Sequence, residues 1–438
     1  MSNSKNFKIY LVSIQYPPNI TGGGGVIVRE LSRELVKNNK NVTVLCFGLK
    51  DKKDEILTLS DKDGIFKVPV KRFFSDDSNL IKNPYQGSKE DEFKRFEEFI
   101  EKIFRFLKNK KGLIHLHGHY LVPFLAKKLK MEGNMAPIIT SYHALESIAL
   151  EKKNIKNIYA INYIREKERE SLKYCDLAIV NSKKVKYQLN LMYPEEFNQN
   201  KVAILPNPVN NELIYFKKTS KKEKLQNRKK YNLKEDSNLI FSIGRIDKIK
   251  GYDILIESLY HVGKMTEKNI SLVIAGFLED KNIEYYNILN ELAFKIKDRY
   301  SNIEIIFIPN ISNEEKIKFL DDCICFITAA ILEPFGITTL ESWIREKPVI
   351  TSETEGSKDL FNIKKNEKPM FLIRDKGLIV SNQNDKRENF AKAIIYLLNN
   401  IEESLRMGKY GKEFVLKNYT WKSIVKKYIE KYDSLINN

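Results

Sequence analysis

The chain has 438 residues, of which 42% are hydrophobic and 30% charged, and its formal net charge is +18 at pH 7. This length predicts two or three domains, each large enough to bury a core, and the composition is that of a soluble globular protein. No apolar run reaches the roughly 18 residues of a membrane span. Residues 1–6 lead directly into a strand-like segment without a signal-peptide core. We therefore expect a cytoplasmic protein.

The positive charge would attract phosphorylated ligands, anionic lipid surfaces or nucleic acid. The densest basic run, residues 217–230, holds eight basic side chains, one acidic side chain and no aromatic one. Proteins that bind single-stranded nucleic acid by base stacking interleave aromatic residues with basic ones. We therefore interpret this run as a solvated linker or helix face and expect no nucleic-acid partner. A peripheral position at the anionic inner face of a membrane stays open.

The four cysteines all lie in or beside apolar stretches, and none has the spacing of a zinc finger. Cys323 and Cys325 resemble half of a metal site, but no second pair completes it. We predict four small buried side chains, which fits a reducing compartment.

Short β-rich segments alternate with helical patterns along the first half of the chain. Residues 26–37 place four aliphatic side chains on one helical face. Residues 90–107 also carry apolar side chains at helical spacing, and their interspersed acids favour a helix packed on its sheet over a membrane-docking helix. The predicted strands of this half are Lys8–Ser13, Val42–Phe47, Leu113–His117, Ile138–Ser141, Leu177–Val180 and Val202–Leu205.

A second series of strands follows the polar stretch 208–236. Strands that alternate with helices predict parallel sheets covered on both faces, hence two doubly wound α/β domains. We place the first at residues 1–207 and the second at 208–419. The predicted strands of the second domain are Leu239–Ile243, Leu272–Ala275, Ile303–Ile308, Cys323–Thr328, Pro348–Thr351 and Leu378–Val380.

Two motifs fall where ligands gather in such sheets, at the carboxyl ends of the strands. The glycine run 22–25 lies between the first strand and the first helix, so its backbone N–H groups can approach a phosphate closely. Arg245 follows the first strand of the second domain, and Lys250 comes five residues later. Two fixed cations there would stabilise the charge that develops on a leaving diphosphate. The alternatives are an ordinary flexible glycine loop and two ordinary basic side chains on the surface.

Four of the five histidines lie between positions 115 and 143. His115, His117 and His119 end one predicted strand, and His143 ends the next. Adjacent strand ends would bring these imidazoles together over one cleft. A zinc site on one strand face and a structural polar cluster are the alternatives, although no acidic partner for zinc lies nearby.

Glu333 and Glu341 lie eight residues apart around a loop-to-helix junction. Thr338 or Thr339 could cap the helix that runs through Glu341 and Trp343. Backbone N–H groups at such a helix start form an anion site, and the two carboxylates could hold sugar and ribose hydroxyls. Alternatively, Glu333 and Glu341 could be two solvated side chains on either side of an ordinary helix start.

Four motifs together resemble those of the family-4 retaining glycosyltransferases, which have the two-domain GT-B fold. Glu333–Glu341 resembles the E-x7-E motif of that family. The other three resemblances are Gly24-Gly25-Val26, Ala203–Asn207 and Gly244-Arg245…Lys250-Gly251. Family members commonly carry an H-x-H whose second histidine would be His117. The stretches at His117–Tyr120 and His143–Glu146 also resemble sucrose synthase and sucrose-phosphate synthase.

The resemblance implies transfer of a sugar, with retention, from a nucleoside-diphosphate sugar that is most often UDP-linked. Such enzymes need no bound metal, because basic side chains take its electrostatic role. Glu333 would hold sugar hydroxyls, Glu341 the ribose, Arg245 with Lys250 the diphosphate, and His117 the sugar or acceptor near the anomeric carbon. The helix 420–438 would cross back to the first domain. The implied donor-binding residues are Gly24, Gly25, His143, Arg245, Lys250, Glu333, Phe335, Gly336, Ile337, Thr338 and Glu341.

Three departures from the family pattern leave the donor and the acceptor open. Pro208 replaces a glycine, Ala329-Ala330 replaces Pro-Ser, and Glu355-Gly356 replaces Gly-Gly. The acceptor could be a small sugar, a sugar phosphate, a lipid carrier or a polysaccharide. Two other interpretations stay open as well: another GT-B enzyme, such as a glycogen-synthase-like transferase or a phosphorylase, and a non-enzymatic protein that binds sugar nucleotides or anionic surfaces.

Overall fold

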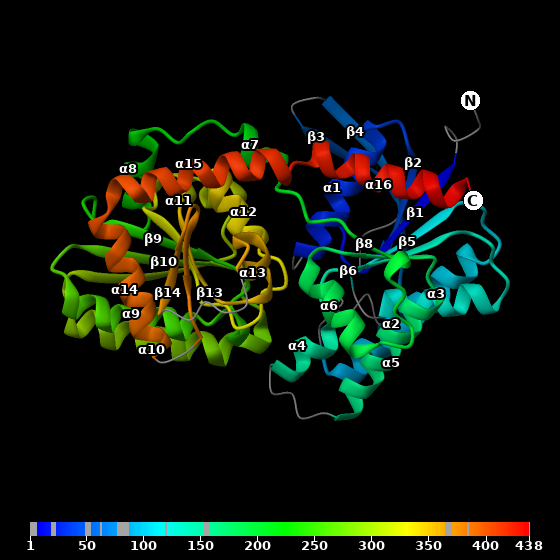
Figure 1. Ribbon diagram of the computed structural model, residues 1–438, viewed down its shortest axis with the longest axis horizontal. Coiled ribbons are helices and arrows are strands. Elements are labelled where there is room, and N and C mark those ends of the chain that lie inside the picture. Colours follow the sequence, from blue (N-terminus) through cyan, green and yellow to red (C-terminus); the bar gives the residue numbers. More distant parts are fainter. Residues whose placement is uncertain are drawn as a thin grey trace. The chain divides into compact units, whose positions relative to one another are not determined.

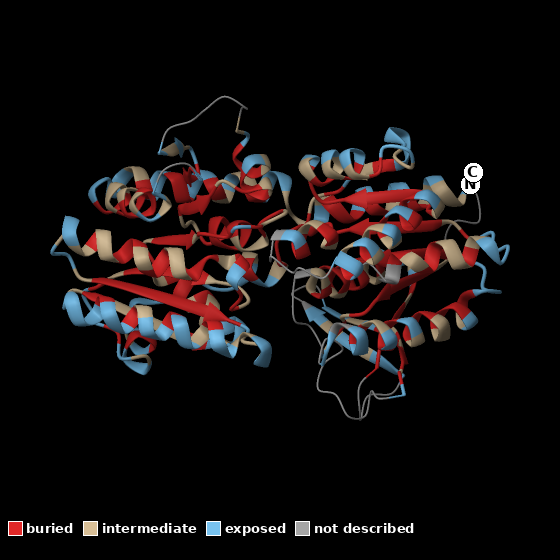
Figure 2. Ribbon diagram, turned by 90° about the horizontal axis from the view of Figure 1, so that it is seen from below, coloured by how far each residue is buried: buried red, intermediate tan, exposed pale blue. Residues whose placement is uncertain are grey.

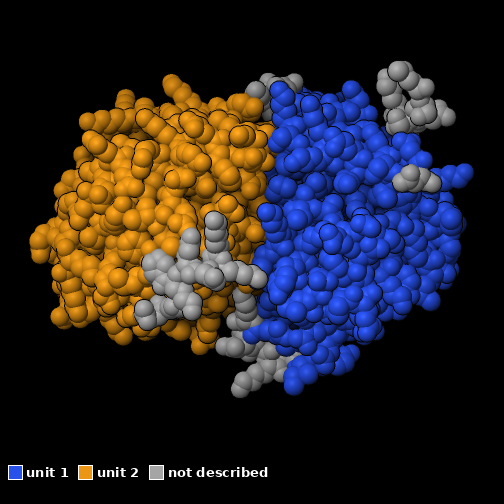
Figure 3. Space-filling view, viewed as in Figure 1, with its two compact units in different colours: residues 1–208, 421–438 blue, residues 209–420 orange. Residues whose placement is uncertain are grey.

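The computed structural model describes residues 7–18, 23–48, 54–61, 64–76, 87–118, 121–152, 158–363, 370–382 and 385–437. The chain divides into two compact units, and each is described by itself. Unit 1 consists of Met1–Pro208 and Trp421–Asn438, and unit 2 of Val209–Thr420 (Figure 3).

Unit 1 is built on an eight-stranded sheet with the strand order β3-β4-β2-β1-β5-β6-β7-β8 (Figure 1). The strands pair in parallel except for β3 and β4, which form an antiparallel hairpin at one edge. All six predicted strands of this half are present. The strands are β1 (Lys8–Ser13), β2 (Asn41–Phe47), β3 (Glu55–Asp61), β4 (Gly64–Phe73), β5 (Leu113–His117), β6 (Ile138–Tyr142), β7 (Leu177–Val180) and β8 (Val202–Ile204).

Helices cover this sheet and complete the core of unit 1. The residues at 90–107 form the helix α2, and its apolar side is buried at Phe96, Phe99, Ile100 and Ile103, so the packed interpretation is confirmed. The last helix, α16, belongs to unit 1. Its Asp433 forms an ion pair at 2.9 Å with Lys40, which lies between α1 and β2. The helices are α1 (Gly23–Lys37), α2 (Lys89–Leu107), α3 (Leu121–Met131), α4 (Glu146–Lys152), α5 (Ile158–Tyr174), α6 (Lys183–Met192) and α16 (Trp421–Ile436), with a 3-10 turn at Gln199–Lys201.

Unit 2 has a seven-stranded sheet with the order β11-β10-β9-β12-β13-β15-β14, parallel except for the edge pair β14–β15. Successive residues of β9 and β10 enter two different hydrophobic clusters, because neighbouring side chains point to opposite faces of a strand. Both faces are therefore buried beneath helices (Figure 2). The strands are β9 (Asn238–Ile243), β10 (Ile270–Gly276), β11 (Ile303–Pro309), β12 (Cys325–Thr328), β13 (Val349–Ser352), β14 (Phe371–Arg374) and β15 (Gly377–Val380).

The helices of unit 2 follow the predicted alternation with strands. They are α7 (Asn211–Tyr215), α8 (Lys221–Lys230), α9 (Tyr252–Met265), α10 (Ile283–Arg299), α11 (Asn313–Asp322), α12 (Ile337–Ile344), α13 (Glu355–Phe361), α14 (Lys386–Asn399) and α15 (Ile401–Asn418), with 3-10 turns at Lys248–Lys250 and Asp280–Asn282. The doubly wound α/β class predicted for both halves, with helices on both faces of each sheet, is confirmed.

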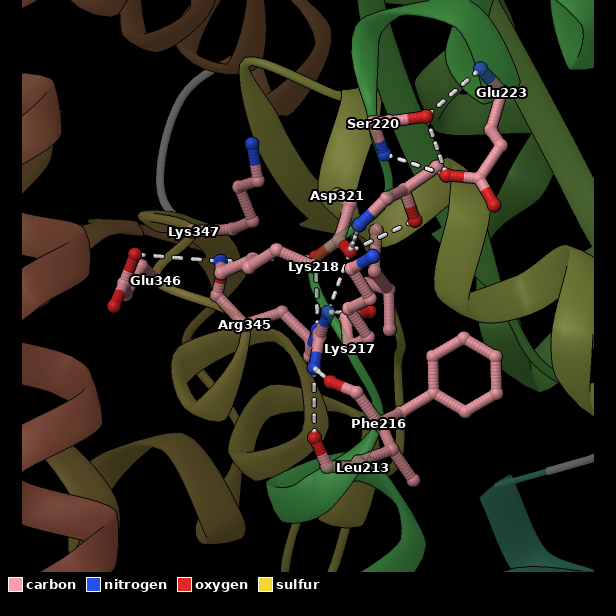
Figure 4. Close-up of polar contacts among 12 residues, drawn as sticks. Leu213, Phe216, Lys217, Lys218, Ser220, Glu223, Asp321, Arg345, Glu346 and Lys347 are labelled. Carbon is pink, nitrogen blue, oxygen red and sulfur yellow. Dashed lines mark hydrogen bonds and ion pairs between the residues drawn. The ribbon is translucent and has the colours of Figure 1, made fainter.

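The basic run 217–230 is largely a solvated helix with two anchors. Arg228 is buried, and its Nε donates to Asp322 at 2.7 Å. The segment that leads into the run is held by the buried guanidinium of Arg345, which donates to the carbonyls of Leu213 and Phe216 at 2.9 and 2.8 Å (Figure 4). This segment is thus part of the packed structure of unit 2 and not a free linker.

All four cysteines are buried and unpaired, as predicted. Burial raises the pKa of the Cys46, Cys175 and Cys323 thiols to about 12. They therefore stay protonated at neutral pH and act as small apolar side chains.

Candidate functional site

In unit 2, Lys250 and Glu333 form an ion pair at the carboxyl edge of the sheet. Lys250 lies after β9 and Glu333 after β12, and these two strands are neighbours. The Nζ of Lys250 lies 2.8 Å from Oε2 of Glu333, and about a fifth of each side chain is exposed. The other carboxylate oxygen, Oε1, accepts a hydrogen bond from the backbone N–H of Gly336 at 3.1 Å. Both oxygens of Glu333 are thus held by donors.

Glycines allow the backbone to approach closely around this pair. Gly251 has a φ of 65°, and a Cβ there would lie 2.4 Å from the carbonyl oxygen of Ala329. A Cβ on Gly356 would lie 2.4 Å from the carbonyl oxygen of Phe335, and the Gly356 N–H donates to the carbonyl of Glu333 at 2.8 Å. Any side chain at either position would push apart the loops that carry Lys250 and Glu333.

The helix after Glu333 begins differently from the sequence-based prediction. Gly336, with a φ of 97°, is the N-cap of α12, and no side chain caps the helix. Thr338 and Thr339 lie inside its first turn, so their predicted capping role is wrong. Glycine occupies the N-cap position because the backbone there adopts a left-handed conformation, which threonine disfavours. The first N–H groups of α12 are therefore not occupied by a capping side chain.

The remaining motif residues of unit 2 lie around this pair. Arg245 is one-third exposed, and its guanidinium lies 3.8 Å from Asp247, so it does not join the Lys250–Glu333 pair. Ile337 and Thr338 are half-buried in the first turn of α12, whereas the ring of Phe335 is buried in the core. Any contact of Phe335 with a ligand would have to come from its backbone.

Glu341 lies one turn into α12 and has a partner that the sequence did not reveal. The Nζ of Lys316, on α11, lies 3.0 Å from Oε1 of Glu341, and each side chain is only 12% exposed. No motif marks Lys316, which is one of two lysines on the charged helix α11. Only its ion pair with Glu341 on α12 identifies it.

Unit 1 has its own cavity of about 180 Å³ at the carboxyl ends of β1, β5 and β6. The predicted glycines and two of the predicted histidines line it. A Cβ on Gly24 would lie 3.6 Å from Cδ2 of His143, so this glycine is in contact distance of the imidazole. The polar and glycine residues of the lining include Gly24, Gly25, His117, His143, Glu146 and Glu168.

The two histidines of β5 differ in what their ring nitrogens bind. In His115, Nδ1 is 2.6 Å from the hydroxyl of Tyr432 on α16, and Nε2 is 2.7 Å from the hydroxyl of Ser141. His117 is 1% exposed, and neither of its ring nitrogens has a hydrogen-bond partner. His115 is thus a structural bridge, whereas His117 has two unused polar atoms at the cavity wall.

Burial also determines the charge of these imidazoles. It holds the pKa of His117 well below its usual range and lowers the pKa of His143 to about 4. Both rings are therefore neutral at pH 7, and their centroids lie 5.9 Å apart. His119 lies outside the described residues. Within the described ranges, no group of three His, Cys, Asp or Glu side chains is arranged to hold a metal ion.

Glu168, on α5, is a cavity residue that the sequence did not single out. Its carboxylate accepts hydrogen bonds from the backbone N–H of Glu146 at 2.7 Å, the hydroxyl of Ser147 at 2.7 Å and the hydroxyl of Tyr193 at 2.6 Å. Burial raises the pKa of Glu168 to about 7 in spite of these donors. In the sequence it is one of several acids on an amphipathic helix, and a solvated position is the ordinary expectation.

Comparison with known families places both halves of the chain in one class of enzyme. Residues 21–213 match the family model described as Glycosyltransferase Family 4, and residues 223–414 match the one described as Glycosyl transferases group 1. The protein is a glycosyltransferase. This class disfavours the alternative of a non-enzymatic binding protein.

Individual relatives agree with this assignment. The transferase is 25% identical over 356 residues to an uncharacterized glycosyltransferase of Methanocaldococcus jannaschii, a match that covers 80% of this chain and 81% of that protein. Sucrose-phosphate synthase from Thermosynechococcus elongatus has a TM-score of 0.76 at 19% identity, covering 99% of this chain and 100% of that one. Anabaena HepE in complex with UDP and glucose has a TM-score of 0.70 at 13% identity, covering 98% and 100%.

These structural likenesses confirm the predicted GT-B fold of the transferase, and at such identities they show the fold alone. Across the described part of the transferase, no helix combines the length and the apolar character that crossing a membrane requires.

Proposed function

We propose that this glycosyltransferase moves a sugar from a nucleoside-diphosphate sugar, UDP-linked, to an acceptor hydroxyl with retention at the anomeric carbon. The observation that carries the proposal is the Glu333 carboxylate, fixed by Lys250 and by the Gly336 N–H beside the start of α12. A carboxylate held on both oxygens is oriented before a ligand arrives, which is the arrangement that binds sugar hydroxyls with little loss of entropy.

Different residues of unit 2 would bind different parts of the donor. Arg245 and Lys250 would stabilise the diphosphate as the glycosidic bond breaks, and the N–H groups of Ile337 and Thr338 would add to this anion site. Glu341 would accept hydrogen bonds from the ribose hydroxyls. Glu333 would bind hydroxyls of the transferred sugar.

The residues of unit 1 would bind the phosphates and position the groups around the reacting anomeric carbon. Gly24 and Gly25, in the first turn of α1, would offer N–H groups to phosphate. His117 would hold the sugar or the acceptor near the anomeric carbon, and His143 would contact the donor. The likeness of this histidine region to sucrose-phosphate synthase supports a sugar ligand here.

The proposed reaction is a same-face displacement with an oxocarbenium-like transition state and no enzyme nucleophile. The leaving phosphate would accept the proton of the acceptor hydroxyl. Glu333 is a poor nucleophile in this arrangement, because its two oxygens already accept hydrogen bonds. One solved structure of the same fold supports a UDP-linked donor, since the Anabaena structure contains UDP and glucose.

We also propose that turnover needs no metal, because Arg245 and Lys250 supply positive charge to the diphosphate. Activity should then survive exhaustive chelation with EDTA, measured as UDP release before and after dialysis. Loss of activity that added Mg²⁺ or Zn²⁺ restores would overturn this part of the proposal.

The place of action we propose is the cytoplasm, with the inner membrane face as a candidate surface for lipid acceptors.

The function is tested by turnover assays with UDP-glucose, UDP-N-acetylglucosamine and GDP-mannose. We expect slow hydrolysis of a UDP-linked donor without acceptor, and a rate roughly tenfold to a hundredfold lower in Glu333→Ala. A glycogen-synthase-like transferase would instead elongate an α-glucan primer. A phosphorylase would release sugar 1-phosphate from a glycan only when inorganic phosphate is present, and that result with no donor turnover would refute the proposal.

A further inference from the structure

The imidazole of His117 has no hydrogen bond that fixes its orientation. The side chain is 1% exposed, and both ring nitrogens are buried without a hydrogen-bond partner. The χ2 torsion of a histidine has two broad minima, and a half-turn between them exchanges each ring nitrogen with a ring carbon. A neighbour that selects one orientation therefore decides whether a nitrogen or a carbon of His117 faces the cavity.

His115 is the neighbour in closest ring contact with His117. The two residues are two positions apart on β5, so their side chains point to the same face of the sheet. Their ring centroids lie 3.8 Å apart, with the ring planes tilted by 40°. The ring of His143 stacks on His117 at 5.9 Å. His117 is thus packed against two other imidazoles and bonded to neither.

Two hydroxyl groups fix the ring of His115. Its Nδ1 lies 2.6 Å from the hydroxyl of Tyr432, and its Nε2 lies 2.7 Å from the hydroxyl of Ser141. A flip of this ring would break both hydrogen bonds. A phenol is more acidic than an aliphatic alcohol and is the better donor. Tyr432 therefore donates to Nδ1, which leaves the proton of His115 on Nε2, where it is donated to Ser141.

A fixed proton gives the ring of His115 a dipole of fixed direction. At ring contact in a buried site, where little water screens it, such a dipole acts strongly on the ring beside it. Of the two orientations of His117, the one whose dipole opposes that of His115 is favoured. The direction of the His115 dipole depends on which hydroxyl donates, and hence on Tyr432.

We infer that Tyr432, on the C-terminal helix α16, is a positioning residue for sugar transfer, and that it sets through His115 the orientation of the His117 ring at the cavity. This inference rests on the proposed function, in which His117 holds the sugar or the acceptor near the anomeric carbon. Tyr432 is fully buried and is not among the described residues that line the cavity, so it acts only through His115.

A second tyrosine of α16 supplies a matched control. Tyr428 lies one turn before Tyr432, is 2% exposed and has its ring 6.0 Å from that of His115. Its hydroxyl has no hydrogen-bond partner among the described residues. Tyr432→Phe should lower kcat for donor turnover by roughly tenfold and change the donor KM less than about twofold, whereas Tyr428→Phe should leave both unchanged. An unchanged kcat in Tyr432→Phe, or an equal fall in both variants, overturns the inference.

A double-mutant cycle shows whether Tyr432 acts through His115. His115→Phe keeps a ring beside His117 and removes both hydrogen bonds. In that background Tyr432→Phe should change kcat by less than about twofold, because the route to His117 is already broken. A further fall as large as that in the wild type would show that Tyr432 acts by packing α16 alone, which would refute a positioning role.

Ring signals of ¹⁵N-labelled histidine report the coupling without any substrate. The signals of the five histidines are assigned by substituting them one at a time. The wild type should show a single tautomer of His115 with the proton on Nε2, and Tyr432→Phe should shift the signals of both His115 and His117. Tyr428→Phe should leave the His115 tautomer unchanged. Unchanged His117 signals in Tyr432→Phe overturn the inference.

The proposed function can fail separately. If no donor turns over in the wild type, sugar transfer is refuted, and the histidine signals still decide whether Tyr432 orients His117.

Discussion

The ammonium group of Lys250 lies 2.8 Å from the carboxylate of Glu333, across two neighbouring strand ends of unit 2. The pair links the residue proposed to bind the diphosphate with the residue proposed to bind the sugar. Because both side chains keep about a fifth of their surface exposed, a ligand can reach each of them without breaking the fold.

This pair predicts that Glu333→Ala and Lys250→Met act mainly on turnover. Each change removes a charge-assisted hydrogen bond worth about 1.5–3 kcal/mol and leaves its partner misplaced. We expect kcat for donor hydrolysis to fall by roughly tenfold to a hundredfold, with little change in UDP affinity for Glu333→Ala. Steady-state kinetics and UDP calorimetry measure the two effects. Full turnover in Glu333→Ala would remove its role in binding the sugar.

Arg245 should contribute to the transition state, because its guanidinium is part-exposed and free of the Lys250–Glu333 pair. Removing a donor of this kind costs about 2.7–4 kcal/mol, so Arg245→Ala should lower kcat roughly a hundredfold to a thousandfold and raise the donor KM less. Arg245→Lys should recover only part of the rate, since an ammonium cannot hold two phosphate oxygens as the planar guanidinium does.

Kinetics on both variants, with circular dichroism to confirm folding, decides the role of Arg245. An exposed residue without function should change turnover by less than about twofold. That outcome in Arg245→Ala would contradict the electrostatic account of the reaction.

The Lys316–Glu341 pair predicts a coupled effect on nucleotide binding. Glu341→Ala should weaken UDP binding by about 1.5–3 kcal/mol, because the ribose loses a charged acceptor. Lys316→Met should weaken it as well and destabilise the fold, since it leaves a carboxylate with 12% exposure without its cation. Calorimetry and urea unfolding of the two single variants and of Lys316→Met/Glu341→Gln test this. The double variant should regain most of the lost stability, and no regain would show that the two residues are not coupled.

Glu168 predicts a pH dependence of stability. Its pKa is raised from 4.5 to about 7, so the folded state binds this proton more tightly than the unfolded chain does. Its contribution is therefore fully present below about pH 4.5 and is lost as the pH rises through 7. The shift corresponds to a loss of about 3 kcal/mol, which Glu168→Gln should abolish. Urea midpoints at pH 5 and pH 8 should differ less in Glu168→Gln than in the wild type and in Glu195→Gln, which removes the same charge from an exposed position of unit 1. Identical differences in all three would contradict the assignment.

Local sequence signals predicted the strands well because each buried parallel strand is a continuous apolar run. They missed the β3–β4 hairpin, where Val68 and Val70 are buried but Ile56 and Ile65 are 64% and 70% exposed, so that no continuous apolar run marks it. They also missed the short edge strand β14. The prediction that Thr338 caps α12 was wrong because a helical pattern in the sequence does not reveal the left-handed backbone at Gly336.

The residues of the candidate site were also predicted from the sequence only in part. The motifs predicted Lys250, Glu333 and His117 as site residues, and in the structure each lies at or after the carboxyl end of a strand. Lys316 and Glu168 became visible only in the structure, because their partners lie on other helices. The resemblance to the family singled out His117, but the structural role of His115 became visible only through its contacts with Tyr432 and Ser141.

The central claim is sugar transfer with retention from a UDP-linked donor, and the configuration of the first product tests it most directly. Hydrolysis or transfer of the donor that turns over fastest is followed by proton NMR from the first minutes, before mutarotation mixes the anomers. The proposed mechanism predicts that an α-linked UDP-sugar yields the α-anomer first, with a reaction without enzyme as the control. Initial formation of the β-anomer would contradict the same-face displacement and require an inverting reaction at this site.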